Sequence, residues 1–119
     1  MPEIFTYGRF EVEPQNEVAF FDAWSEFAAW ASARPGAGTL RLARDVRKAG
    51  RFISLGAWAG PDPVQAWKSS PEFKERLGRL VSQAKEFEPT ELVPLLQAAG
   101  GEVETLSPPA DIQPIHAPT

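Results

Sequence analysis

The amino-acid sequence predicts an α+β fold in which one antiparallel sheet carries helices on one face. Segments with the two-residue periodicity of strands alternate with segments that have the spacing of amphipathic helices. Their order is strand, helix, strand, strand, helix, strand. A short Lys48-Ala49-Gly50 turn joins the second and third strands, as expected for an antiparallel pair. Together these observations indicate a split β-α-β sandwich.

The first strand is predicted over residues 3–12, because apolar side chains recur on both of its faces. Gly8 leaves a gap on one face, as glycine in a strand often does where another group approaches closely. The first helix is predicted over residues 16–33, where Phe20, Trp24 and Phe27 form an apolar stripe.

The second strand is predicted over residues 39–47, with Leu40, Leu42, Arg44 and Val46 on a buried face. Arg44 is the exception on that face. We expect its guanidinium to reach the sheet edge while its stem covers apolar surface, or else to meet Asp22, Glu26 or a bound anion.

The third strand is predicted over residues 51–59. Its face with Phe52 and Trp58 also carries two small residues, Ser54 and Gly56, which leave room beneath the Trp58 ring.

Two helices should follow the third strand. A Gly-Pro-Asp-Pro corner leads into a short helix that contains Trp67. Asp62 and Ser70 each precede a proline, which is the arrangement of an N-cap followed by proline at the first helical position. The longer helix is expected to begin at Pro71 and to continue until the residues before Pro89, which disfavours a helical neighbour.

A fourth strand is predicted over residues 90–97, at a sheet edge because it contains Pro94. Residues 103–106 are a further candidate strand. We predict one domain over residues 1–100 and an extended, proline-rich tail over residues 101–119.

Composition excludes several classes of function. The 119 residues carry a net charge of −4, which disfavours nucleic acid and anionic membranes as partners. The chain has no cysteine and one histidine, so neither a metal site nor a Ser-His-Asp triad is expected. No apolar run is long enough to span a membrane and no signal peptide is evident, so we expect a cytoplasmic protein.

The second sheet face is predicted to bind another copy of the chain. It carries large or apolar side chains that no helix would cover, namely Phe5, Tyr7, Ile53, Leu55 and Ala57. An exposed apolar face of this kind normally marks a partner surface. We therefore expect a homodimer formed through the sheet face.

The spacing Trp58-(eight residues)-Trp67-(five residues)-Phe73 resembles that of the antibiotic biosynthesis monooxygenase family. Ser70-Pro71-Glu72-Phe73 matches the family's Ser-x-x-Phe opening of the long helix. The resemblance extends over roughly residues 4–96. It implies a ferredoxin-like fold that pairs into a dimeric α+β barrel, with a pocket between sheet and helices in each subunit. Members of the family and its relatives include cofactor-independent quinol oxygenases, heme degraders and proteins of unknown activity.

Two departures argue against heme degradation. Leu77 stands where heme-degrading members have the histidine that binds iron, and Gly8 stands where they have an asparagine. The one histidine, His116, lies in the predicted tail. We therefore expect no cofactor.

The predicted substrate-binding residues are Trp58, Trp67, Phe73, Arg76 and Trp24. The two tryptophans at the strand–helix corner are candidates for a flat wall against a planar ligand, with simple core packing as the alternative. Arg76 is a candidate for binding a phenolate or carboxylate, with a solvated position as the alternative. No catalytic residue is assigned.

The resemblance and the aromatic residues favour a cofactor-independent monooxygenase that acts on a small aromatic or quinol-like compound. The alternative is a non-catalytic, dimeric ligand-binding or stress-related protein of the same fold, which is consistent with the absence of an evident acid–base residue.

Overall fold

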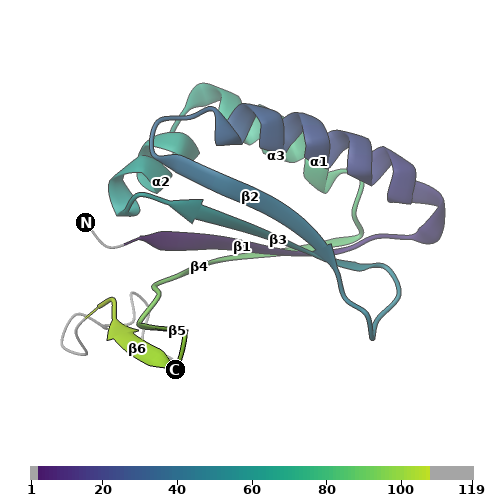
Figure 1. Cartoon of the computed structure of the whole chain (residues 1–119). Helices are drawn as coiled ribbons and strands as arrows, with labels where there is room; N and C mark the ends of the chain where they lie inside the picture. The colour runs from purple at the N-terminus through teal and green to yellow at the C-terminus, as the bar shows by residue number, and fades with distance from the viewer. Residues whose placement is uncertain (1–2, 108–119) are drawn as a thin grey trace, which may run out of the picture.

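The computed structural model describes residues 3–107 and has helices packed on one face of an antiparallel sheet, as predicted (Figure 1). The four-stranded sheet has the order β2-β3-β1-β4, so β1 and β3 are central. Its strands are β1 (Ile4–Glu11), β2 (Ala37–Arg44), β3 (Arg51–Trp58) and β4 (Glu86–Leu92).

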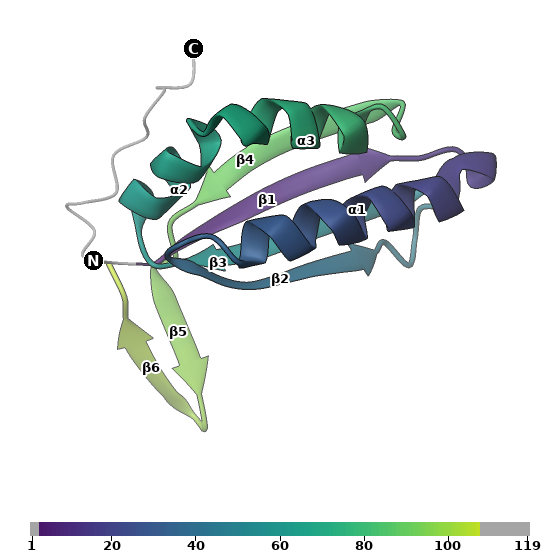
Figure 2. The ribbon, with the colours of Figure 1, turned by 90° about the horizontal axis from the view of Figure 1, so that it is seen from above.

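Three α-helices form the second layer. Seen from above, α1 lies over the β2–β3 side of the sheet and α3 lies over the β4 side (Figure 2). The helices are α1 (Glu17–Ser32), α2 (Pro61–Lys68) and α3 (Pro71–Val81), and a 3-10 turn (Pro14–Asn16) precedes α1.

Aromatic side chains between the layers form much of the core. Phe10 of β1 contacts Phe20 of α1, with ring centroids 5.0 Å apart, and Phe20 contacts Phe52 of β3 at 5.4 Å. All three rings are buried. The apolar stripe predicted for the first helix is therefore confirmed as the surface that attaches α1 to the sheet.

Both later helices differ from the sequence prediction at one end. Helix α2 begins at Pro61, and its N-cap is Gly60, whose φ of 135° suits glycine. Asp62 was therefore wrongly predicted as the N-cap and lies in the first turn instead. Ser70 is the N-cap of α3 as predicted, but its hydroxyl donates to the Trp67 carbonyl oxygen at 2.8 Å.

The long helix ends earlier than predicted, and the fourth strand begins earlier. Helix α3 stops at Val81, and the N–H of Lys85 donates to the Glu11 carbonyl oxygen at 2.9 Å. That bond starts the pairing of β4 with β1. Pro89 lies within β4 opposite Gly8, and the sheet tolerates it because β4 is an edge strand.

A separate two-stranded hairpin follows β4 and projects away from the helices and the main sheet (Figure 2). It consists of β5 (Leu96–Ala99) and β6 (Glu102–Thr105), with Gly100 and Gly101 at its turn. The hairpin crosses the boundary predicted at residue 100, so the first residues of the predicted tail form a paired strand. The remaining tail residues, 108–119, lie outside the described part of the chain.

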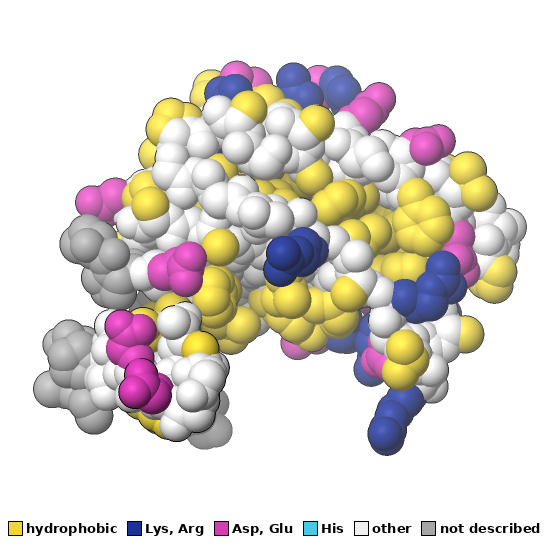
Figure 3. Space-filling model, viewed as in Figure 1, with side chains coloured by type: hydrophobic (Ala, Val, Ile, Leu, Met, Phe, Trp, Pro, Cys, Tyr) yellow, Lys and Arg dark blue, Asp and Glu magenta, His cyan; other side chains and the backbone are white. Residues whose placement is uncertain are grey.

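The sheet face opposite the helices is open in the described structure. The molecule is arched, with a hollow between the β5–β6 hairpin and the β2–β3 loop (Figure 3). Leu55 is 42% exposed on this face, and its neighbour Ile53 is half-buried. The homodimer predicted for this face stays a prediction.

Two residues of the second predicted strand lie at its exposed end. Val46 was predicted to be buried but is 93% exposed, because β2 ends at Arg44 and the chain turns there. Arg44 stays exposed, places its guanidinium 5.1 Å from the Phe52 ring centre and pairs with Glu17 at 3.5 Å. It therefore snorkels over apolar surface, as expected.

Within residues 3–107, no helix has the length and apolar character needed to cross a membrane. The cytoplasmic location expected from the sequence stays a prediction.

Candidate functional site

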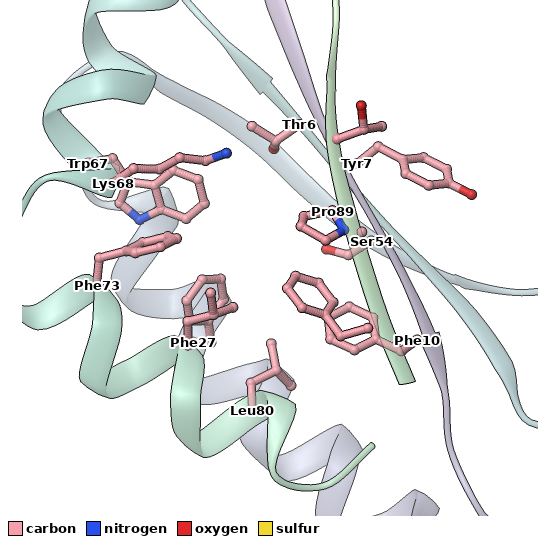
Figure 4. Close-up of a pocket in the computed structure, with 14 residues that line it drawn as sticks. Thr6, Tyr7, Phe10, Phe27, Ser54, Trp67, Lys68, Phe73, Leu80 and Pro89 are labelled. Carbon is pink, nitrogen blue, oxygen red and sulfur yellow. The ribbon is translucent and has the colours of Figure 1, made fainter. Parts of the chain in front are cut away.

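A cavity of about 170 Å³ lies between the sheet and the helices, next to α2 and α3 (Figure 4). Its lining comes from β1, β3 and β4 and from all three α-helices. The lining residues are Thr6, Tyr7, Gly8, Phe10, Phe27, Ser54, Trp67, Lys68, Phe73, Leu77, Leu80, Phe87, Pro89 and Thr90.

Aromatic rings form most of the walls. On the helix side, the ring of Phe73 meets the indole of Trp67 edge-on, with centroids 4.8 Å apart and an interplanar angle of 80°. Phe27 of α1 lies 5.8 Å from the same indole. On the sheet side, Phe10 and Phe87 stack at 4.7 Å. Such a lining favours a flat, largely apolar ligand.

The sheet side of the cavity also carries two hydroxyl groups that accept hydrogen bonds from tryptophans. The indole N–H of Trp58 donates to Thr6 Oγ1 at 3.2 Å, and the indole N–H of Trp24 donates to Ser54 Oγ at 3.0 Å. Each hydroxyl retains its own hydrogen, because it acts as an acceptor in these bonds. Thr6 and Ser54 are thus fixed in position and able to donate to a ligand oxygen.

Trp67 differs from these two tryptophans. Trp67 is 7% exposed, and its Nε1–H has no hydrogen-bond partner among residues 3–107. A buried donor without a partner is costly and rare in folded proteins. Trp67 lines the cavity with its ring, whereas its Nε1 is closed off from solvent and lies on the Phe73 side of the indole, away from Thr6 and Ser54 (Figure 4).

Glycine residues make space at two places on the sheet. A Cβ atom at Gly8 would lie 3.1 Å from Cε1 of Phe87, so glycine keeps that wall of the cavity in place. A Cβ atom at Gly56 would lie 2.7 Å from Thr6 Oγ1 and 3.2 Å from Trp58 Nε1. Gly56 therefore makes room for the Trp58–Thr6 hydrogen bond, whereas the sequence suggested open space beneath the ring.

The structure brings four of the five predicted binding residues to this region. Trp67 and Phe73 line the cavity directly. Trp58 lies behind Trp67, stacked at 4.5 Å, and Trp24 reaches Ser54 from α1. Arg76 lies elsewhere, with its guanidinium 5.1 Å from the ring centre of Trp30.

Lys68, the one cation of the cavity lining, was not predicted from the sequence. Its Nζ lies 3.0 Å from Glu91 Oε2, so the ion pair joins α2 to β4. Leu77, which the family resemblance matches to the iron-binding histidine of heme degraders, also lines the cavity and offers no ligand atom. No group of three or more His, Cys, Asp or Glu side chains suited to a metal occurs in the described residues.

The principal buried charge lies outside the cavity, at the Glu11 end of β1. Glu11 is 5% exposed and accepts hydrogen bonds from Arg51, at 2.7 Å, and from Arg9. Burial raises the pKa of Glu11, but the bonds from Arg51 and Arg9 together outweigh burial and hold that pKa below its ordinary value. This ionised cluster joins β1 to β3 and takes no part in the cavity.

Solved structures with the same fold include characterised and uncharacterised proteins. A mutant of SnoaB, a cofactor-independent oxygenase from Streptomyces nogalater, is 19% identical, with a TM-score of 0.74 over 86% of this chain and 100% of that chain. A conserved protein from Methanosarcina mazei Go1 is 17% identical, with a TM-score of 0.70 over 78% of this chain and 93% of that chain. At such low identities the likeness shows the fold alone.

Comparison at the level of sequence gives the family. No curated protein sequence matches the chain. The family model described as antibiotic biosynthesis monooxygenase matches residues 4–77, which is more than half of the chain and includes β1 to Leu77 of α3. The chain therefore belongs to the antibiotic biosynthesis monooxygenase family.

Proposed function

We propose that the protein is a cofactor-independent monooxygenase that acts on a small aromatic or quinol-like compound. Membership of the family supports an oxygenase in general. The observation that carries the finer proposal is a cavity with mostly aromatic walls and two hydroxyl groups, of Thr6 and Ser54, fixed on its sheet side. This combination suits a planar ring that bears an oxygen acceptor.

The substrate ring would lie between the helix-side wall, with Trp67 and Phe73, and the sheet side, with Thr6 and Ser54. The Trp67 indole would contact the substrate ring, and the two hydroxyls would be available to a substrate oxygen. These contacts hold the ring in one orientation and displace water from it, which are the contributions that a positioning site makes to rate.

In this type of reaction the ionised substrate itself reduces dioxygen. The quinolate supplies the four electrons that reduce O₂. One oxygen atom is inserted at a ring C–H bond, and the other leaves as water with the two hydrogens of the quinol hydroxyls, so the product is a hydroxyquinone. The protein needs to hold the ring, exclude water and favour the anion. Trp67, Phe73 and the two hydroxyls supply the first two of these requirements.

Oxygen consumption tests the proposal. Purified protein is incubated with a panel of hydroquinones and naphthohydroquinones, and uptake is compared with heat-denatured protein to subtract autoxidation. Isotopically labelled dioxygen should place one labelled atom in the product. Trp67→Phe should weaken binding of an accepted substrate about fivefold, the scale of roughly 1 kcal/mol for a specific aromatic contact.

Trp30→Phe is the matched control, because Trp30 stacks against Arg34 and Arg76 and does not line the cavity. It should leave both uptake and affinity unchanged. Equal effects of the two substitutions would show that Trp67 acts through stability alone.

A non-catalytic ligand-binding or stress-related protein is the second candidate. It is favoured by the cavity lining, which contains neither a carboxylate nor a histidine in the described residues. Such a protein would show a ligand-dependent rise in melting temperature with a quinol but no enzyme-dependent oxygen uptake.

A further inference from the structure

Lys68 lines the cavity, although helical spacing from its neighbour Trp67 would direct it elsewhere. It is the last residue of α2, and its side chain is 31% exposed. In Figure 4 the side chain extends beside the Trp67 indole, with the amine directed toward Thr6. The one cation of the lining is thus directed toward the Thr6 hydroxyl, which is available to a ligand oxygen.

The present partner of Lys68 is exchangeable. Glu91 lies on the edge strand β4, and its side chain is 45% exposed. Ion pairs at this level of exposure contribute little to stability, because water solvates both groups. An anion that arrives inside the cavity can therefore replace Glu91 as the partner of the ammonium group.

We propose that Lys68 is the anion-binding residue of the cavity, and that it selects aromatic ligands whose hydroxyl ionises, binding them as phenolates. The inference rests on the proposed function, since it names the substrate class of the same site. Glu91 acts as the competing carboxylate that holds the ammonium group at the mouth while the cavity is empty.

Electrostatics explains why Lys68 would decide whether a phenol binds in its ionised or its neutral form. An oxyanion transferred from water into an apolar cavity is strongly disfavoured unless a charge or strong donors compensate it. Thr6 and Ser54 offer neutral donors, whereas Lys68 alone among the lining residues offers a full positive charge. Lys68 should therefore lower the pKa of a bound phenol relative to the same phenol in water. Phenols should bind better than their methyl ethers, which cannot ionise.

The test uses 4-nitrophenol, whose ionised form has its own absorption band, and 4-nitroanisole as the ether that cannot ionise. Wild-type protein should bind the phenol as phenolate and lower its apparent pKa by about one unit, equivalent to roughly tenfold tighter binding of the anion than of the neutral form. The affinity for 4-nitroanisole measures how much the aromatic walls contribute to binding without any ionised oxygen.

Three variants assign the effect. Lys68→Met keeps an unbranched apolar stem and removes the charge, so it should abolish the pKa shift and leave affinity for 4-nitroanisole unchanged. Lys68→Arg should retain the preference for phenolate. Glu91→Gln removes the competing carboxylate and should tighten phenolate binding severalfold.

Lys74→Met is the matched control, because Lys74 is exposed on α3 outside the cavity lining, and it should bind both probes as wild type does. Retention of the phenolate preference in Lys68→Met would overturn the inference, as would wild-type protein that binds neither probe. Phenolate binding through Lys68 without oxygen uptake would support the role of Lys68 and contradict the oxygenase proposal. The role of Lys68 and the oxygenase proposal can therefore fail separately.

Discussion

The indole of Trp58 lies almost flat against that of Trp67, with ring centroids 4.5 Å apart and planes inclined by 27°. Both side chains are buried, yet only Trp58 has a hydrogen-bond partner in the described structure, Thr6. Trp58 therefore supports the cavity wall from behind, and Trp67 presents that wall to a ligand.

This difference predicts unequal effects of the same substitution. Trp58→Phe should lower the free energy of unfolding by about 2–3 kcal/mol, because it removes a hydrogen bond and buried volume. Trp67→Phe should cost only about 1 kcal/mol, since it also removes an unsatisfied donor. Urea denaturation without ligand measures both. An equal or larger loss for Trp67→Phe would mean that its N–H has a favourable partner in the folded protein.

Two glycines predict opposite responses to alanine. Gly56→Ala should destabilise the fold by about 1–3 kcal/mol, because the new methyl group would collide with the Thr6–Trp58 hydrogen bond. Gly78 lies in α3, and a methyl group added there would meet nothing within 4 Å, so Gly78→Ala should stabilise by about 0.5–1 kcal/mol. Thermal melts of the pair provide an internal control. Stabilisation by both substitutions would show that β1 and β3 can move apart at little cost in free energy.

Glu11 predicts a loss of stability in acid. Its pKa in the folded protein is held below the ordinary value of 4.5, so folding favours the ionised form. The stability that Glu11 contributes is fully present above about pH 4.5, the ordinary pKa of a glutamate. It is lost as the pH falls through the lower pKa that Glu11 has in the folded protein. Glu11→Gln should cost about 1–3 kcal/mol at pH 7.

Denaturation of wild type and Glu11→Gln at a series of pH values checks this expectation. The difference between the two proteins should shrink below pH 4.5 and stay constant above it. A difference that is independent of pH would assign the effect to packing. Glu75→Gln, at an exposed carboxylate on α3, should change stability little at any pH.

The open sheet face predicts the state of association. Wild-type protein should sediment as a dimer at micromolar concentration. Ile53→Asp should give monomers or aggregates, because burial of an unpaired carboxylate at an interface is costly. Ala29→Asp, on the exposed side of α1, should leave the dimer intact. A wild-type monomer under these conditions would contradict the proposed association.

The central part of the fold follows from local patterns, because apolar spacing and proline positions report directly on strands and helices. The end of α3 does not, since Ala84 and Phe87 continue the helical spacing of Leu77 and Leu80 beyond Val81. The switch to a strand depends on a hydrogen bond between Lys85 and Glu11, residues that are distant in the sequence.

The candidate site was predictable only in part, for a similar reason. Trp67 and Phe73 were found through their spacing. Arg76 follows Phe73 by one helical turn, yet the rotation of α3 directs it to Trp30. Lys68 adjoins Trp67 and by helical spacing should point elsewhere, but its long stem returns the amine to the cavity mouth. Helix rotation and side-chain reach depend on packing, which a local pattern does not record.

Pro89 has a consequence for how molecules meet at high concentration. It lies on the outermost strand of the sheet, among the carboxylates of Glu86, Glu88 and Glu91. A proline has no N–H to donate to a ladder, so a second copy of β4 could not pair fully with this strand. Edge-to-edge stacking into fibres is therefore blocked along this border, even while the broad apolar face of the same sheet remains free to pair.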